Sequence, residues 1–200
     1  TYIFEGLELF WQGDIQKALT FFEKAYKLDS KDASTYANLA ACYYALRDVE
    51  KAREICMDGL KVNPAHLGLN VWAARTLAYQ RNAQALYFAE CAIELGGDWW
   101  LAHLAMAEAC VIAEEMDTDI GLSIIRREME VVVALAGDHA EALLLQAQSL
   151  SLSDQPQEAI ELLKNILGNP ALLYPITKYE TRRLLAQLLL SENHLEEALK

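Results

Sequence analysis

The chain has 200 residues, of which 54% are hydrophobic, and only 9 glycines and 4 prolines interrupt it. This composition supplies enough apolar surface for a buried core and too few turn residues for a many-stranded β fold, so we predict an all-α protein and exclude a disordered chain. The net charge of −12 argues against nucleic acids and anionic membrane surfaces as partners, because both are themselves negatively charged.

The first predicted helical hairpin covers about residues 1–32. Gly13-Asp14 is a turn signal that separates two helical segments. After this turn, small and apolar residues recur at helical spacing, at Ala18, Phe22, Ala25 and Leu28. We therefore predict two antiparallel helices joined by a tight turn.

Residues 33–66 show the clearest pattern in the chain. Small residues allow two helices to approach closely, and large residues fill the space between them. The small positions are Ala40, Ala52 and Gly59, and the large ones are Tyr36, Leu39, Tyr43, Ile55 and Leu60. Pro64 cannot continue a helix, so it ends the second helix of this unit.

The pattern continues in four further units, which are residues 67–97, an irregular unit 98–139, residues 140–173, and a truncated unit 177–200. We place the surplus length of the irregular unit in its helices or in the acidic turn at 114–119. Because the first unit lacks its first turn and the last stops within its second helix, we expect either a piece of a longer array or a chain with disordered flanks.

The excess negative charge is concentrated in the middle of the chain. Residues 82–163 carry 15 acidic and only 2 basic side chains. Two interpretations stay open, a solvated outer face and an acidic surface that steers a basic partner.

The 34-residue unit resembles the tetratricopeptide repeat, most closely in residues 33–66. The matching positions are Tyr36 at the first aromatic site, Leu39-Ala40 where the family has Leu-Gly, Arg47-Asp48 where it has Gly-Asp, Ala52 and Gly59 at the small sites, and Asn63-Pro64 at the close. The resemblance implies that residues 1–200 form a single array, a right-handed α-solenoid of helix-turn-helix repeats with a concave groove lined mainly by the first helix of each repeat.

The resemblance also implies which residues face this groove. They are Ile3, Leu7, Phe10, Trp11, Asn38, Ala41, Tyr44, Val71, Arg75 and Tyr79. Aromatic residues at helical spacing are equally consistent with interior packing. One family subtype clamps a terminal carboxylate with Lys, Asn and Arg, but only Asn38 matches that set, so we predict an apolar peptide or helix as the ligand instead.

Sequence motifs for catalysis or metal binding are absent, including a phosphate loop, GxSxG and HExxH. The histidines His66, His103, His139 and His194 lack metal-ligand spacing, and we interpret them as hydrogen-bonded or surface residues. The cysteines Cys42, Cys56, Cys91 and Cys110 form no CxxC pair, and we interpret them as reduced packing residues. We therefore predict a non-enzymatic protein without catalytic residues, metal or cofactor.

These features predict a scaffold or chaperone-like module that holds an apolar or basic segment of a partner protein in its groove, within a larger assembly or secretion machine. The alternatives are self-association into a homo-oligomer and a regulatory array attached to an enzyme. Reduced cysteines, and apolar runs well below the roughly 20 residues that span a bilayer, favour a cytoplasmic location without direct membrane insertion. A periplasmic location or membrane attachment through flanking segments stays open.

Overall fold

The computed structural model describes residues 2–112, 118–136, 139–152, 155–169, 175–192 and 194, except the side chains of 112, 118–122, 152, 175 and 176. In these residues the chain forms eleven α-helices and no strand, which confirms the predicted all-α class. The helices are α1 (Tyr2–Trp11), α2 (Ile15–Leu28), α3 (Ala33–Ala45), α4 (Val49–Val62), α5 (Leu67–Tyr79), α6 (Gln84–Gly96), α7 (Trp100–Ile112), α8 (Thr118–Ala136), α9 (Ala140–Leu152), α10 (Pro156–Gly168) and α11 (Pro175–Ser191).

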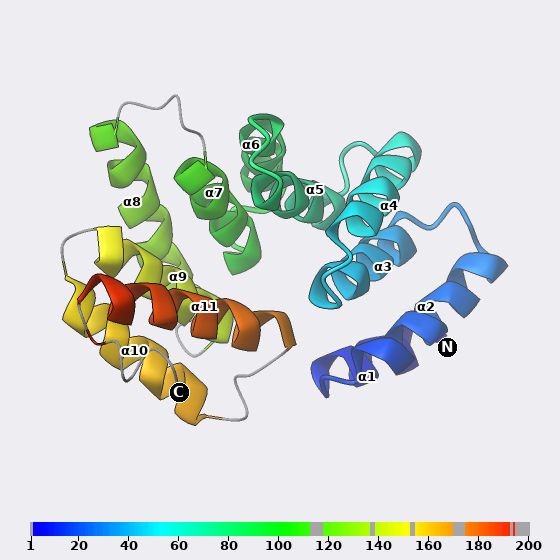
Figure 1. The fold of residues 1–200 in the computed structure, drawn as a ribbon. Coiled ribbons are helices and arrows are strands. Elements are labelled where there is room, and N and C mark those ends of the chain that lie inside the picture. Colours follow the sequence, from blue (N-terminus) through cyan, green and yellow to red (C-terminus); the bar gives the residue numbers. More distant parts are fainter. Residues whose placement is uncertain are drawn as a thin grey trace.

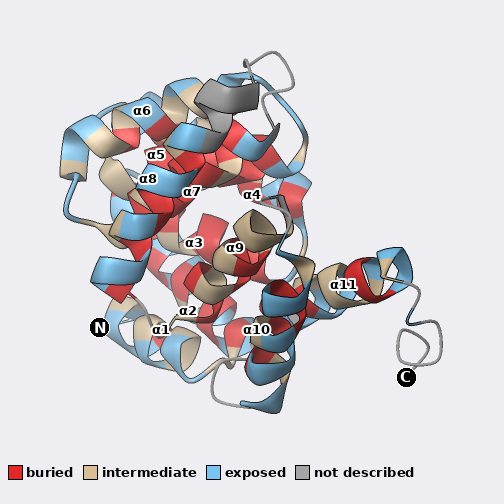
Figure 2. Cartoon of the chain, turned by 90° about the vertical axis from the view of Figure 1, so that its left-hand side faces the viewer, coloured by how far each residue is buried: buried red, intermediate tan, exposed pale blue. Residues whose placement is uncertain are grey.

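The helices pack in consecutive hairpins, and the hairpins stack into a curved solenoid (Figure 1). The first helix of each hairpin, from α1 to α9, lies toward the inside of the curve, and α11 continues this inner row. Figure 2 shows buried residues on the helix faces that meet neighbouring helices and exposed residues on the outer faces. None of the described helices combines the length and apolar character needed to cross a membrane.

The turn inside each of the first three hairpins has the same geometry. Gly13, Arg47 and Arg81 occupy equivalent places with φ values of 82°, 68° and 55°. In the first two turns the following residue, Asp14 or Asp48, accepts a hydrogen bond from the backbone at the start of the next helix. Glycine adopts a positive φ without steric cost, whereas for a residue with a Cβ this conformation costs roughly 1–2 kcal/mol of conformational energy. Arg47 and Arg81 therefore hold a strained backbone, which makes their side chains of interest.

Small residues at the hairpin contacts are required, as the sequence pattern predicts. Ala40 and Ala52 are fully buried. A Cβ added to Gly59 would lie 2.8 Å from the Cδ1 atom of Leu69 and 2.8 Å from the Cβ atom of Tyr36. The second and third hairpins therefore approach too closely at this point for any larger side chain without rearrangement.

The cysteines of the described residues are free, and three of them are packing residues as predicted. Cys42, Cys56 and Cys110 are buried, and Cys91 is half-buried. Burial raises the pKa of the Cys42 thiol to about 12 and that of Cys110 to about 11. These two thiols therefore stay protonated and unreactive near neutral pH.

The irregular unit departs from its neighbours mainly in its second helix. The helix α8 has 19 residues, whereas α4 has 14. His103 joins α7 to α8 because its Nδ1 atom lies 2.5 Å from the Glu128 carboxylate, while its Nε2 atom lies 2.6 Å from the Gly97 carbonyl oxygen. Part of the surplus length is thus in α8, and most of the predicted acidic turn at 114–119 lies outside the described residues.

The sixth unit begins slightly earlier than the sequence predicts. The helix α11 starts at Pro175, where a proline at the first helical position suits the fixed φ of its ring. The predicted second helix of this unit falls in residues 195–200, which lie outside the described residues.

The start of α5 gives a testable dependence of stability on pH. His66 precedes α5, and its Nδ1 atom accepts a hydrogen bond of 3.2 Å from the backbone N–H of Leu69. Burial lowers the pKa of His66 below its usual value of 6.5, and the nearby Asp32 opposes this shift more weakly. Because the folded pKa is lowered, the cap stabilises above the unfolded pKa and is lost as the pH falls through the folded pKa.

We expect loss of this cap to cost about 1 kcal/mol, measured by urea denaturation at about pH 7.5 and about pH 5.5. The control is His66→Asn, whose side chain caps a helix at both pH values. An equal pH dependence in the parent chain and in His66→Asn would show that His66 is not the responsible group.

Candidate functional site

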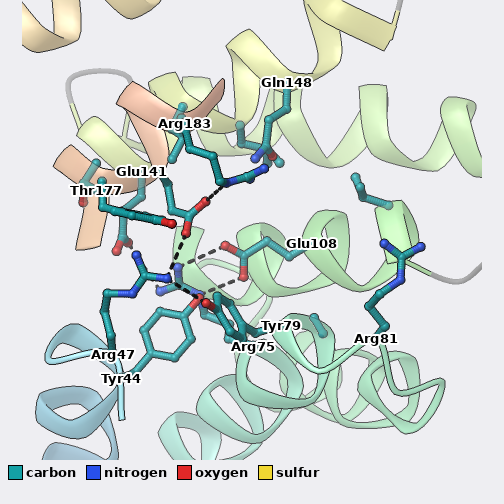
Figure 3. A pocket seen from close by; sticks show the side chains of 16 residues that line it. Tyr44, Arg47, Arg75, Tyr79, Arg81, Glu108, Glu141, Gln148, Thr177 and Arg183 are labelled. Carbon is teal, nitrogen blue, oxygen red and sulfur yellow. Dashed lines mark hydrogen bonds and ion pairs between the residues drawn. The ribbon is translucent and has the colours of Figure 1, made fainter. Parts of the chain in front are cut away.

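A cavity of about 510 Å³ lies on the concave side of the solenoid. All residues that line it come from the first helix of a hairpin or from the turn after that helix, in α3, α5, α7, α9 and α11. We call it the central cavity; it is lined by Tyr44, Arg47, Arg75, Tyr79, Arg81, Glu108, Glu141, Gln148, Thr177, Tyr179, Glu180 and Arg183, with Ala78, Val111, Leu144 and Leu145 between them (Figure 3).

Arg75 is the centre of an ion-pair network that joins three consecutive hairpins. Its Nε and Nη2 atoms donate to the two Glu108 carboxylate oxygens at 2.8 and 3.0 Å, and Nη1 donates to Glu141 at 3.4 Å. The guanidinium also lies over the rings of Tyr44 and Trp72, 4.8 and 5.1 Å from their centroids. The Arg75 side chain is 3% exposed, so these contacts replace its hydration completely.

The pKa values in this network follow from burial and pairing. Burial by itself would lower the pKa of Arg75, but Glu108 and Glu141 outweigh it and raise that pKa well above the usual value. Burial raises the pKa of Glu108, and the charge of Arg75 offsets only part of this effect. Arg75 therefore favours the ionised form of the Glu108 carboxylate against the effect of burial.

A second cluster surrounds Arg47, in the turn between α3 and α4. Its Nη2 atom donates to the Tyr79 hydroxyl at 2.8 Å and lies 3.7 Å from a carboxylate oxygen of Glu180 in α11. Its guanidinium lies 3.7 Å from the ring centroid of Tyr179, also in α11. We call this set, Arg47, Tyr79, Tyr179 and Glu180, the Arg47 contact. It links the second hairpin directly to the sixth unit.

A smaller cavity of about 80 Å³, which we call the aromatic pocket, adjoins the central cavity. It is lined by Phe10, Trp11, Ile15, Ala41, Tyr44, Ala45, Trp72, Trp100, Leu101, His139, Ala140 and Glu141. Tyr44 and Glu141 line both cavities, so the two are parts of one concave surface with an apolar end and a charged end.

The structure brings six of the ten predicted groove residues to these cavities. Phe10, Trp11, Ala41 and Tyr44 line the aromatic pocket, while Tyr44, Arg75 and Tyr79 line the central cavity. The other four, Ile3, Leu7, Asn38 and Val71, line neither. Of these, Val71 is fully buried in the core, and Leu7 packs against a core cluster of α2 and α3 residues.

Several lining residues were outside the sequence prediction, and two signals point to them. Arg75, Glu108 and Glu141 are spaced 33 residues apart, which is close to one repeat, so opposite charges at that period indicate a network across the stack. Arg47 and Arg81 stand where the first hairpin has Gly13. A non-glycine residue at a position that favours positive φ is a signal for a functional side chain.

The middle of the chain directs part of its acidic excess inward. The Glu108 and Glu141 side chains are 23% and 25% exposed and pair with Arg75, while that of Glu128 is 5% exposed beside His103. Among the described residues, no cluster of three or more His, Cys, Asp or Glu side chains could hold a metal ion. These three carboxylates are therefore engaged, Glu108 and Glu141 by Arg75, and Glu128 by His103 and Arg127.

Comparison with known proteins identifies the repeat. Residues 9–68 match the family model of the tetratricopeptide repeat. Over 60 residues the chain is 40% identical to the small glutamine-rich tetratricopeptide repeat-containing protein of Dictyostelium discoideum, a stretch that covers 30% of this chain and 18% of that protein. The sequence match therefore concerns a minor part of the relative's length.

Solved structures extend the likeness to the whole array. A tetratricopeptide repeat protein of Thermus thermophilus, TTC0263, has a TM-score of 0.68 at 20% identity and covers 94% of this chain and 97% of its own. Cut9–Hcn1 of the APC/C has a TM-score of 0.71 at 15% identity over 96% of this chain and 36% of its own. YrrB, described as a TPR protein with an unusual peptide-binding site, has a TM-score of 0.52 at 20% identity, covering 91% of this chain and 90% of its own. Residues 9–68 are therefore similar in sequence to the tetratricopeptide repeat family, and the described helices share the fold of solved tetratricopeptide repeat structures.

Proposed function

We propose that this chain binds a segment of a partner protein on its concave surface, with an apolar side chain of that segment in the aromatic pocket. The tetratricopeptide fold is one of protein-protein interaction scaffolds. The observation that carries the proposal is the alignment of the aromatic pocket and the central cavity along one surface, built almost entirely from the first helices of five repeats and α11.

The lining favours an apolar ligand over a strongly charged one. Arg75 is already paired with Glu108 and Glu141, and Arg47 with Glu180. A charged ligand would have to compete with these pairs, whereas an apolar side chain gains the transfer of its surface from water, about 25 cal/mol per Å². We therefore expect the affinity to change little with salt concentration, unlike binding driven by the acidic middle of the chain.

Trp11 provides the variant that tests this proposal. It lines the aromatic pocket but is 61% exposed, so Trp11→Glu places a charge at the pocket without burying it. Twelve-residue peptides are selected from a random display library on the full chain, synthesised, and titrated while tryptophan fluorescence is recorded. We expect peptides with aliphatic or aromatic anchors, and we expect Trp11→Glu to weaken their binding by about tenfold or more.

Tyr87 supplies the matched control. It is an exposed aromatic residue of α6, 63% exposed, and it lines neither cavity. Tyr87→Glu introduces the same charge in place of an aromatic ring, and we expect it to leave the peptide affinity unchanged. Equal affinities for Trp11→Glu and the parent chain would contradict binding in the aromatic pocket.

A further inference from the structure

The helix α11 closes the concave surface from the far end of the array. Its first turns lie beside the end of α3 (Figure 1), where Tyr179 and Glu180, which line the central cavity, meet Arg47. The two partners are four hairpins apart along the solenoid. Such a contact fixes how far the superhelix opens, because stacked repeats otherwise touch only their neighbours.

The two ends of α11 are held very differently. Toward its C-terminus, Leu188 and Leu189 are buried in a core cluster with residues of α9 and α10. Toward its N-terminus, Tyr179 is 49% exposed, and the Arg47 and Glu180 side chains are 32% and 18% exposed at an ion-pair distance of 3.7 Å. Water competes for the Arg47 contact but not for the leucine core. Separating α11 from the second hairpin therefore costs the least free energy at the Arg47 contact.

The backbone of Arg47 supports a specific role for this side chain. Its φ of 68° belongs to a turn that glycine forms without strain, as Gly13 does in the first hairpin. An arginine at such a position lowers folding stability unless contacts of its side chain offset the backbone strain. Here the side chain reaches Tyr79, Tyr179 and Glu180 together.

We propose that the Arg47 contact is a clasp, in which α11 of the chain itself covers the central cavity and a partner segment enters when Tyr179 and Glu180 release Arg47. This inference rests on the proposed function of the concave surface. The apparent affinity for a partner is then the intrinsic affinity reduced by the fraction of molecules with an open clasp. Weakening the clasp should therefore strengthen partner binding.

Arg47→Gly and Tyr179→Leu break the clasp from opposite sides. Glycine suits the positive φ of the turn, and residue 179 is half exposed, so both variants retain the fold. Arg81→Gly is the matched control, since it relieves the same strain in the next hairpin from the opposite side of the cavity in Figure 3.

The clasp is measured without a ligand, by pulsed electron paramagnetic resonance on the full chain. Spin labels are attached at cysteines replacing the exposed residues Lys51 in α4 and Arg182 in α11. Only Cys91 needs replacement by serine beforehand, because Cys42, Cys56 and Cys110 are buried. We expect Arg47→Gly and Tyr179→Leu to add a longer-distance population that Arg81→Gly lacks.

The titration with the selected peptides then tests whether the clasp controls access. We expect Arg47→Gly and Tyr179→Leu to increase the apparent affinity by about threefold to tenfold, the range set by one cation–π contact and one exposed ion pair. Unchanged spin-label distances in both variants would overturn the clasp, and opening without a gain in affinity would overturn its control of access. Equal peptide binding by Trp11→Glu and the parent chain would instead count against the proposed site, while the distances still decide the clasp.

Discussion

Replacing Arg75 with methionine should lower the free energy of unfolding by about 3–5 kcal/mol near neutral pH, because it leaves two partly buried carboxylates without their cation. Arg75 is 3% exposed and supplies three hydrogen bonds to Glu108 and Glu141. The substitution also removes the contacts of the guanidinium with the rings of Tyr44 and Trp72. Urea denaturation of the parent chain and the variant measures the difference.

The loss should depend on pH in a defined direction. The pKa of Glu108 is already raised by burial, and Arg75 opposes that rise. Without Arg75 the pKa of Glu108 rises further, so over a wider pH range the folded state holds a proton that the unfolded state has released. We therefore expect the deficit of Arg75→Met to shrink as the pH falls from about 7 to about 5.

The control removes the carboxylate charges together with the cation. In the triple variant Arg75→Met, Glu108→Gln and Glu141→Gln, no buried charge is left unpaired, and most of the lost stability should return. If the free energy of unfolding of Arg75→Met lies within about 1 kcal/mol of that of the parent chain, the network is solvated and its ion pairs contribute little to stability.

Phe22→Ala should lower the free energy of unfolding by about 3–5 kcal/mol. It should also reverse the sign of the effect of Gly6→Ala on stability. Phe22 is 1% exposed. A Cβ atom added to Gly6 would lie 2.6 Å from the Cε1 atom of the Phe22 ring. In the parent chain, Gly6→Ala should destabilise by about 1–3 kcal/mol, since this clash outweighs the gain of about 1 kcal/mol from helix propensity.

In the Phe22→Ala background the same Gly6→Ala substitution should stabilise, because the ring is gone and the methyl group fills part of its space. Thermal or urea unfolding of the four chains completes the double-mutant cycle. Additive effects would contradict direct packing of α1 against Phe22, and a sign reversal would support it.

The hairpins were predictable from the sequence because each depends on short-range patterns. The small residues Ala40, Ala52 and Gly59 recur at fixed places, and Asp14 and Asp48 cap the helices that follow the turns. These signals act within one repeat or between neighbours, so local propensity and packing agree. The resemblance to the tetratricopeptide repeat, and not these local patterns, named Phe10, Trp11 and Tyr44, which line the aromatic pocket.

The charged part of the site depends on geometry that accumulates along the array. Glu108 lies in the irregular unit, whose register the sequence leaves open, and Glu141 lies one repeat further on. The meeting of Arg47 with Tyr179 depends on the small rotation at each of four successive interfaces. No pattern within a single repeat predicts this accumulated rotation. Val71 is fully buried in the core, although it occupies a family groove position.

The most direct test of the concave binding surface is a crosslinking map on the full chain. A selected peptide with a photoreactive benzophenone in place of its apolar anchor is bound and irradiated, and mass spectrometry locates the adducts. We expect adducts on the inner row around the aromatic pocket, at residues such as Tyr44, Trp72 and Trp100. Adducts concentrated on α4, α6 or α10, which contribute no residue to either cavity, would contradict binding in the groove.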